Sequence, residues 1–175
     1  DLLSRKTLYI TMLLVLVIAS FIMNVPQNIY NTISARSFMT YMGVGLCDIR
    51  IDIQQEQDIP GKSAEIAGVM SQDSSISKYT VLTSIMFDVP MDDGSMAKIK
   101  VELGDHSIFP ISYSSGYSPK AKDEIALSTL LSEELEKNTG DKINLIIDGE
   151  VQSLTVSGLY SDITNGGKTA KALFD

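Results

Sequence analysis

The stretch TLYITMLLVLVIASFIMNV, residues 7–25, is an uninterrupted apolar run near the N-terminus. A helix of this length, at about 1.5 Å per residue, spans roughly 28 Å, close to the ~30 Å hydrocarbon core of a bilayer. No Asp, Glu, Lys, Arg or His occurs from residue 7 through residue 35. The insertion free energy of its Leu, Ile, Val and Phe residues, roughly −3 to −7 kcal/mol, outweighs the cost of its few polar residues. The run therefore predicts a transmembrane helix.

The charges that flank this run predict its orientation. Arg5 and Lys6 precede it directly, and the next positive charge is Arg36. Positive residues accumulate on the cytoplasmic side, so we expect a cytoplasmic N-terminus and an extracytoplasmic remainder. Two alternatives stay open. A buried helix of a soluble protein would normally have a polar face, and a cleaved signal peptide would not continue its apolar residues past Ala19.

Charge and cysteine content limit what the remainder can do. The chain has a net charge of −8, and residues 1–46 carry +2, so residues 47–175 carry −10. Nucleic-acid binding is unfavourable for such an acidic domain, because phosphates need Lys and Arg. Cys47 is the only cysteine, which excludes an intramolecular disulfide, and we interpret it as a small apolar residue at the start of a strand. About 130 residues suffice for one domain with its own core.

A stalk is expected between the membrane run and this domain. Pro26 predicts a kinked or restarted helix, with Asn24 available as its cap. Val25, Ile29 and Ile33 recur every four residues and form a narrow apolar stripe. We interpret this stripe as a coupling face that leans on a neighbouring helix. The stalk should end near residues 43–45, so that residues 1–46 form one part and residues 47–175 the other.

The periodicities of residues 47–175 predict an α+β domain with β-hairpins and two short helices. The expected strands are 47–54, with three isoleucines on one face, then 79–89, 96–103, 124–127, 142–147 and 151–160. The expected helices are 62–70 and a longer one from Ser128 to Asn138. Residues 104–122 are expected to form a loop. Asp92-Asp93-Gly94 and Asp148-Gly149 are typical hairpin turns, and the first lacks the pattern of a calcium loop.

No residue pattern predicts catalysis, a metal or a cofactor. Gly167-Lys168-Thr169 resembles the end of a phosphate-binding loop, but Asp162 stands where that loop needs its first glycine. We therefore expect a flexible glycine turn there. His106 has no nearby nucleophile and fits a surface or loop contact better than a catalyst. The chain is expected not to be an enzyme.

Four segments in order carry a family resemblance: GYSP (116–119), DEIALS (123–128), GDKINL (140–145) and VSGLY (156–160). This order resembles the extracytoplasmic domain of FtsX-like, MacB-type ABC transporter permeases. The resemblance implies a permease in the bacterial plasma membrane that passes the motion of a separate cytoplasmic ABC ATPase to its outer domain. It also implies a second permease copy or half, an extracytoplasmic partner or peptide, and export or extraction of peptides, lipoproteins or antimicrobials.

Other readings of the whole chain remain. The family's further membrane helices are missing, and the chain starts at Asp1 rather than Met, so we expect a segment of a longer protein. The alternative is a single-pass sensor or adhesion protein whose outer domain binds a ligand. A membrane-anchored hydrolase is a third possibility, although no nucleophile and base can be named.

Overall fold

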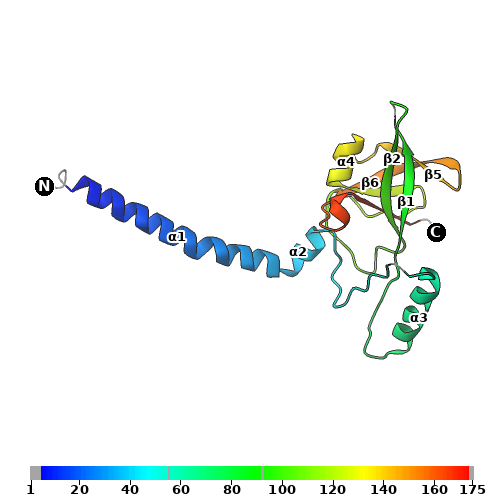
Figure 1. Ribbon diagram of the computed structural model, residues 1–175, viewed down its shortest axis with the longest axis horizontal. Coiled ribbons are helices and arrows are strands. Elements are labelled where there is room, and N and C mark those ends of the chain that lie inside the picture. Colours follow the sequence, from blue (N-terminus) through cyan, green and yellow to red (C-terminus); the bar gives the residue numbers. More distant parts are fainter. Residues whose placement is uncertain (1–4, 55, 92, 174–175) are drawn as a thin grey trace. The chain divides into compact units, whose positions relative to one another are not determined.

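The computed structural model describes residues 5–54, 56–91 and 93–173. It divides the chain into two compact units, Asp1–Phe38 and Met39–Asp175. The architecture is α+β, as predicted: a long apolar helix precedes a sheet with short helices (Figure 1).

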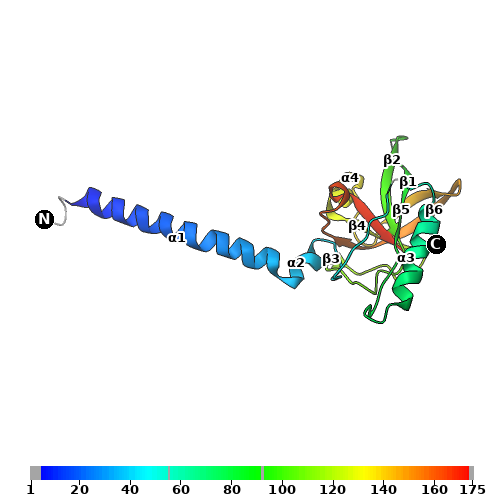
Figure 2. The ribbon, with the colours of Figure 1, turned by 60° about the horizontal axis from the view of Figure 1, so that its bottom comes forward.

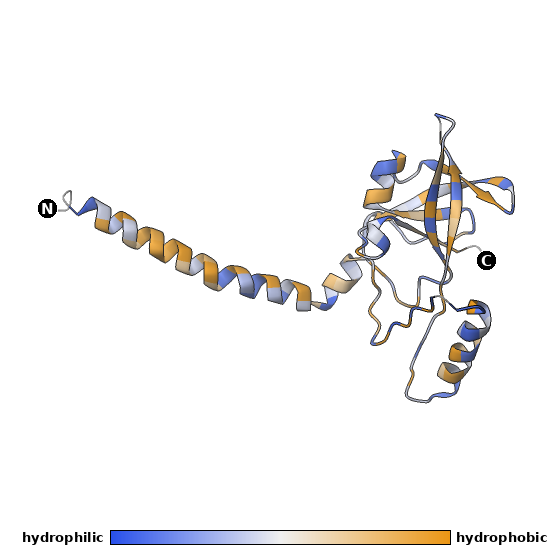
Figure 3. Cartoon of the chain, in the orientation of Figure 1, coloured by the Kyte–Doolittle hydropathy of each residue, from blue (hydrophilic) through white to orange (hydrophobic). Residues whose placement is uncertain are grey.

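The first unit is dominated by α1 (Lys6–Ser34), which is long and apolar enough to cross a membrane by length and composition. Apolar residues cover most of it (Figure 3). A kinked or restarted helix was predicted at Pro26. The restart is wrong, because α1 continues through that residue and breaks only at Ala35, where the backbone is extended, and the kink stays a prediction. Proline removes one donor, and in so apolar a segment the helix remains the only way to pair the other backbone groups. The short α2 (Arg36–Tyr41) follows.

The second unit is built on a sheet that closes on itself. Its strands are β1 (Thr83–Pro90), β2 (Met96–Leu103), β3 (Tyr113–Gly116), β4 (Glu124–Ser128), β5 (Lys142–Ile147), β6 (Glu150–Tyr160) and β7 (Thr169–Ala172). Among the described residues they follow the order β3-β6-β4-β7-β2-β1-β5, and β5 also pairs with β6. That pairing closes the sheet into a barrel, and Figure 2 shows its strands from a second direction. The β2–β7 and β4–β6 pairs are parallel, and the others are antiparallel.

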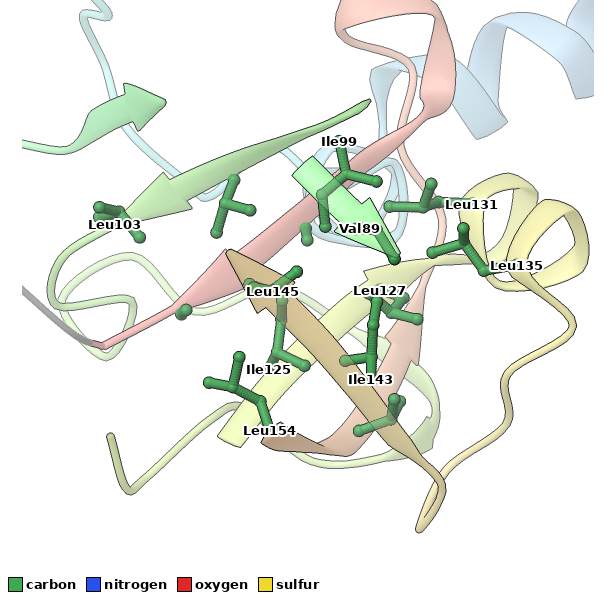
Figure 4. Packing of buried hydrophobic residues seen from close by; sticks show 14 residues of the cluster. Val89, Ile99, Leu103, Ile125, Leu127, Leu131, Leu135, Ile143, Leu145 and Leu154 are labelled. Carbon is green, nitrogen blue, oxygen red and sulfur yellow. The ribbon is translucent and has the colours of Figure 1, made fainter. Parts of the chain in front are cut away.

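The barrel interior holds the core. Side chains from several strands and from α4 (Thr129–Leu135) point toward one another there (Figure 4). Ile125 and Leu127 of β4 and Leu145 of β5 are fully buried. The EIALS segment is buried along nearly its whole length because β4 lies between β6 and β7. The predicted buried strand at 124–127 is thus confirmed.

Both predicted hairpins are present, although the first strand begins at Thr83 rather than at Tyr79. Asp148 and Gly149 have φ values of 52° and 84°, the conformation that a two-residue hairpin turn requires. Gly94 has φ 83° in the first turn, and Asp92 lies outside the described residues.

Both predicted helices are also present, with different bounds. The first, α3 (Ile59–Gln72), begins earlier because the Asp58 side chain caps it by accepting from Gly61 N at 2.9 Å. In the second, the Ser128 hydroxyl accepts from Leu131 N, as predicted. This helix ends at Leu135 rather than at Asn138, because Glu136 adopts a left-handed conformation.

Two predictions about the sheet are wrong, and the strand after the predicted glycine turn was not predicted. Residues 47–54 form no strand, and Cys47 is exposed rather than packed in one. Residues 104–122 are not all loop, because β3 pairs with β6. The predicted glycine turn is a single 3-10 turn, Asn165–Gly167, that leads into β7, where Thr169–Ala172 complete the barrel between β2 and β4. Periodicity missed β7 because all its residues are buried.

Candidate functional site

The surface of α1 suits an apolar environment. No residue of the helix is buried, and its side chains from Leu8 to Met23 are largely apolar and exposed. Several of its polar side chains bond within the helix. The hydroxyls of Thr11 and Thr32 donate to the carbonyls of Thr7 and Asn28, at 2.9 Å and 2.8 Å. Polar groups bonded in this way cost less in a bilayer.

The predicted coupling face lies on one side of α1. Ile29 and Ile33 are 56% and 52% exposed, and Val25 is half-buried. Among the described residues no partner covers the two isoleucines, so their coupling role stays a prediction. Asn24 does not cap a new helix, because its amide donates to the carbonyl of Ser20 at 2.8 Å.

The chain enters the barrel unit through residues 39–46, which we call the root segment. Ser112 N, just before β3, donates to the carbonyl of Thr40 at 2.9 Å. The Ser112 hydroxyl donates to the Thr40 hydroxyl at 3.3 Å. Ile163 N, just after β6, donates to the carbonyl of Met42 at 3.3 Å. The root segment is therefore bonded by backbone groups to two loops of the barrel.

Two glycines let the root segment approach these loops closely. Gly43 is buried, and a Cβ atom added to it would lie 2.5 Å from the carbonyl oxygen of Ser161. A Cβ atom on Gly45 would lie 2.5 Å from the carbonyl oxygen of Phe109. No real Cβ atom tolerates such contacts with backbone. The sequence Gly43-Val44-Gly45 thus permits backbone-to-backbone packing on either side of one residue.

The loop that contacts Met42 and Gly43 is held in turn by a partly buried network of polar side chains. The Asp162 carboxylate accepts from Thr164 N and the Thr164 hydroxyl, at 2.6 Å and 2.7 Å, and from the Thr169 hydroxyl. The Thr169 hydroxyl also lies 2.7 Å from that of Tyr160. Burial raises the pKa of Tyr160 well above its ordinary value, so its hydroxyl remains protonated. The loop is fixed to β6 and β7 through these contacts.

A second set of polar side chains lies in the same part of the barrel. Lys171 on β7 forms a largely buried ion pair with the Glu102 carboxylate on β2. His106 Nε2 donates to the carbonyl of Glu102 at 3.0 Å. Burial and the nearby Lys171 ammonium lower the pKa of His106, which favours the neutral imidazole. His106 lies in the loop after β2, as predicted, but its side chain is buried and bonds to a strand residue instead of forming a surface contact.

The residues around the predicted glycine turn bond to their own neighbours. Lys168 pairs with Glu134 at 2.8 Å, and Gly167 N donates to the carbonyl of Thr164. Asp162, which argued against a phosphate loop, uses its carboxylate for the contacts given above. No group of three His, Cys, Asp or Glu side chains within the described ranges could hold a metal ion.

Comparison with solved structures gives distant similarities, one of which is described below. No protein-family model and no curated protein matches the sequence. A crystal structure of a domain of a candidate permease protein from Porphyromonas gingivalis superposes with a TM-score of 0.49 at 11% identity. The superposition covers 61% of this chain and 54% of that one.

Sequence reasoning did not find the root segment. It placed the stalk's end near residues 43–45 and interpreted the glycines only as its end. Two glycines separated by one residue, outside any predicted tight turn, were the available signal, since such a pair permits close backbone contact.

Proposed function

We propose that this chain is part of an ABC transporter permease of the FtsX-like, MacB type, with α1 in the bacterial plasma membrane. Its N-terminus lies in the cytoplasm, and residues 47–175 lie outside. A separate ABC ATPase subunit hydrolyses ATP, and this chain is not an enzyme. The motion of α1 moves the barrel and thereby supports export or extraction of peptides, lipoproteins or antimicrobials. The ordered sequence motifs and the apolar, uncharged surface of α1 support this proposal.

The root segment is the observation that carries the proposal. A helix that only anchors a domain can be joined to it by a loose linker. Here, Thr40 and Met42 bond to barrel loops through backbone groups, and Gly43 and Gly45 pack against backbone. Backbone contacts of this kind do not depend on side-chain rotamers, so a displacement of residues 39–42 would pass directly to both loops.

Isolation of the native complex tests this function. The full native protein that contains this chain would be purified from its own membranes in mild detergent, through a tag on the cytoplasmic side. We expect an ABC ATPase to co-purify in stoichiometric amount and to hydrolyse ATP. Recovery of the protein without any ATPase, from membranes in which that ATPase is present, would favour the single-pass sensor or adhesion alternative.

A further inference from the structure

Residues 48–54, DIRIDIQ, form a segment with the sequence of a strand but without a partner strand. Ile49 and Ile51 are 78% and 53% exposed, and Ile53 is half-buried. None of residues 48–54 forms a backbone–backbone hydrogen bond with another described residue. In Figure 1 the segment lies in the loop between α2 and α3. An exposed apolar alternation with free backbone groups is a template for pairing with another chain.

One charged side chain of this segment, Arg50, is directed toward its own domain. Arg50 lines a small polar cleft together with Glu102 and Lys171. Arg50 Nε also lies 3.0 Å from a carboxylate oxygen of Asp52, two residues along the chain. Residues two apart share a face in an extended chain, so the isoleucines lie on the other face. Ile49 and Ile51 are the exposed members of that face, and Ile53 is half-buried.

The segment is complementary to itself in one antiparallel register. With Ile51 opposite Ile51 of a second copy, Arg50 lies opposite Asp52, and Ile49 lies opposite Ile53. Opposite charges then pair on one face of the two strands, and isoleucines pair on the other. We propose that residues 48–54 join two copies of this chain through this antiparallel strand pair.

Neighbouring registers are disfavoured by charge or by pattern. A register centred on Arg50 places Arg50 opposite Arg50 and Asp48 opposite Asp52, and one centred on Asp52 places Asp52 opposite Asp52. Like charges directly opposite one another destabilise a strand pair. A register that brings Arg50 opposite Ile51 mixes charged and apolar side chains on one face. A register centred on Ile49 also places Arg50 opposite Asp48, but residues 52–54 then lie opposite residues 44–46 of the root segment, which is packed against the barrel. Charge complementarity over the whole segment thus favours a second copy in the register centred on Ile51.

This inference rests on the proposed permease function, because such a permease is expected to act with a second copy. The crosslinking test is independent of that function, because it measures only whether two residues lie close together. Failure of the crosslink would leave ATPase co-purification intact, whereas absence of an ATPase would leave the crosslink intact. The two results can therefore be distinguished.

Disulfide formation tests the register in the full chain. In a Cys47→Ala background, Ile51→Cys is reconstituted in lipid nanodiscs or kept in membranes and oxidised mildly. Residues directly opposite one another in an antiparallel pair have Cα atoms about 4.5–5.5 Å apart, within the range of a disulfide. Ile49→Cys is the matched control, because the two copies of this residue would lie roughly 13 Å apart. Ile49 is also more exposed than Ile51, so a slower reaction at residue 49 would not result from poorer access to the oxidant.

We expect Ile51→Cys to give a covalent dimer at least tenfold faster than Ile49→Cys. A mixture of Ile49→Cys and Ile53→Cys should give the mixed dimer. Equal rates for Ile51→Cys and Ile49→Cys would indicate random collision and would overturn the proposal. A chain that remains monomeric in every case, or that crosslinks only to a different protein, would overturn it as well.

Discussion

Ser112 N donates to the carbonyl of Thr40 across 2.9 Å, which bonds the C-terminal part of α2 directly to the residue that precedes β3. The next contacts, from Met42 to Ile163 and from Gly43 to Ser161, reach the loop after β6. Two loops far apart in sequence therefore hold one short segment. These contacts are the structural basis for the proposal that the barrel follows the motion of α1.

The first prediction concerns topology. Cys47 is exposed and is the only cysteine, so it reports which side of the membrane holds the barrel. In intact spheroplasts, a membrane-impermeant maleimide should label Cys47 without permeabilisation. Cys47→Ser should not be labelled, and Cys47→Ser with Ser4→Cys should be labelled only after permeabilisation. Labelling of Ser4→Cys alone in intact spheroplasts would show that the orientation is inverted.

The second prediction concerns the glycines of the root segment. Gly45→Ala places a methyl group against the backbone of Phe109, and we expect a loss of roughly 1–3 kcal/mol in the free energy of unfolding of the barrel, as for other overpacked sites. Gly68→Ala in α3 is the control. Nothing lies within 4 Å of its Cβ position, so the better helix former should raise stability by about 0.5–1 kcal/mol.

Chemical denaturation, followed by circular dichroism in detergent, measures both variants. Opposite signs for Gly45→Ala and Gly68→Ala are the expected result. If Gly45→Ala were as stable as the wild type, the close packing of the root segment on residue 109 would be refuted.

The third prediction concerns pH. Burial and Lys171 lower the pKa of His106 in the folded state, while in the unfolded chain it is about 6.5. The unfolded state therefore binds more protons between these two values. The resulting stability is fully present above pH ~6.5 and is lost as pH falls through the lowered folded pKa. Thermal melts should show a smaller decrease on acidification for His106→Gln than for the wild type. An equal decrease in both would exclude His106 as the source.

The sequence allowed the main outlines of the fold to be predicted from particular local signals. Asp148-Gly149 sets a local turn and Ser128 caps the residues that follow it, so the second hairpin and the start of α4 could be predicted from the sequence. The strand pairs β2–β7 and β4–β6 are parallel and join distant segments. No local pattern predicts which of several buried runs meet in this way, which is why β7 was missed.

The error at residues 47–54 has a different cause. The alternation of Ile49, Ile51 and Ile53 correctly indicated an apolar face, but periodicity does not say what covers it. The barrel closes through the β5–β6 pairing and leaves this segment outside. The root segment was missed for a similar reason. Its contacts are made by backbone atoms, so side-chain periodicity does not predict them, and Gly43 and Gly45 are their only sign in the sequence.

The fourth prediction tests the coupling face on α1. Replacing Ile29 and Ile33 by Asp places two carboxylates on the predicted stripe and should separate ATP hydrolysis from the response of the barrel. The double variant Gln27→Asp and Asn31→Asp adds the same charge away from the stripe. It serves as the matched control, since these two side chains bond only to each other at 3.0 Å among the contacts described.

The labelling rate of Cys47 shows whether motion of α1 reaches the barrel, and it is measured in proteoliposomes that contain the full protein and its ABC ATPase. Cys47 N donates to the carbonyl of Gly45 at 3.0 Å, so this thiol adjoins the root segment. We predict that ATP changes its maleimide labelling rate severalfold in the wild type and in the Gln27→Asp, Asn31→Asp control. The Ile29→Asp, Ile33→Asp variant should still hydrolyse ATP but lose this change. A labelling rate that responds to ATP equally in all three proteins would contradict the account.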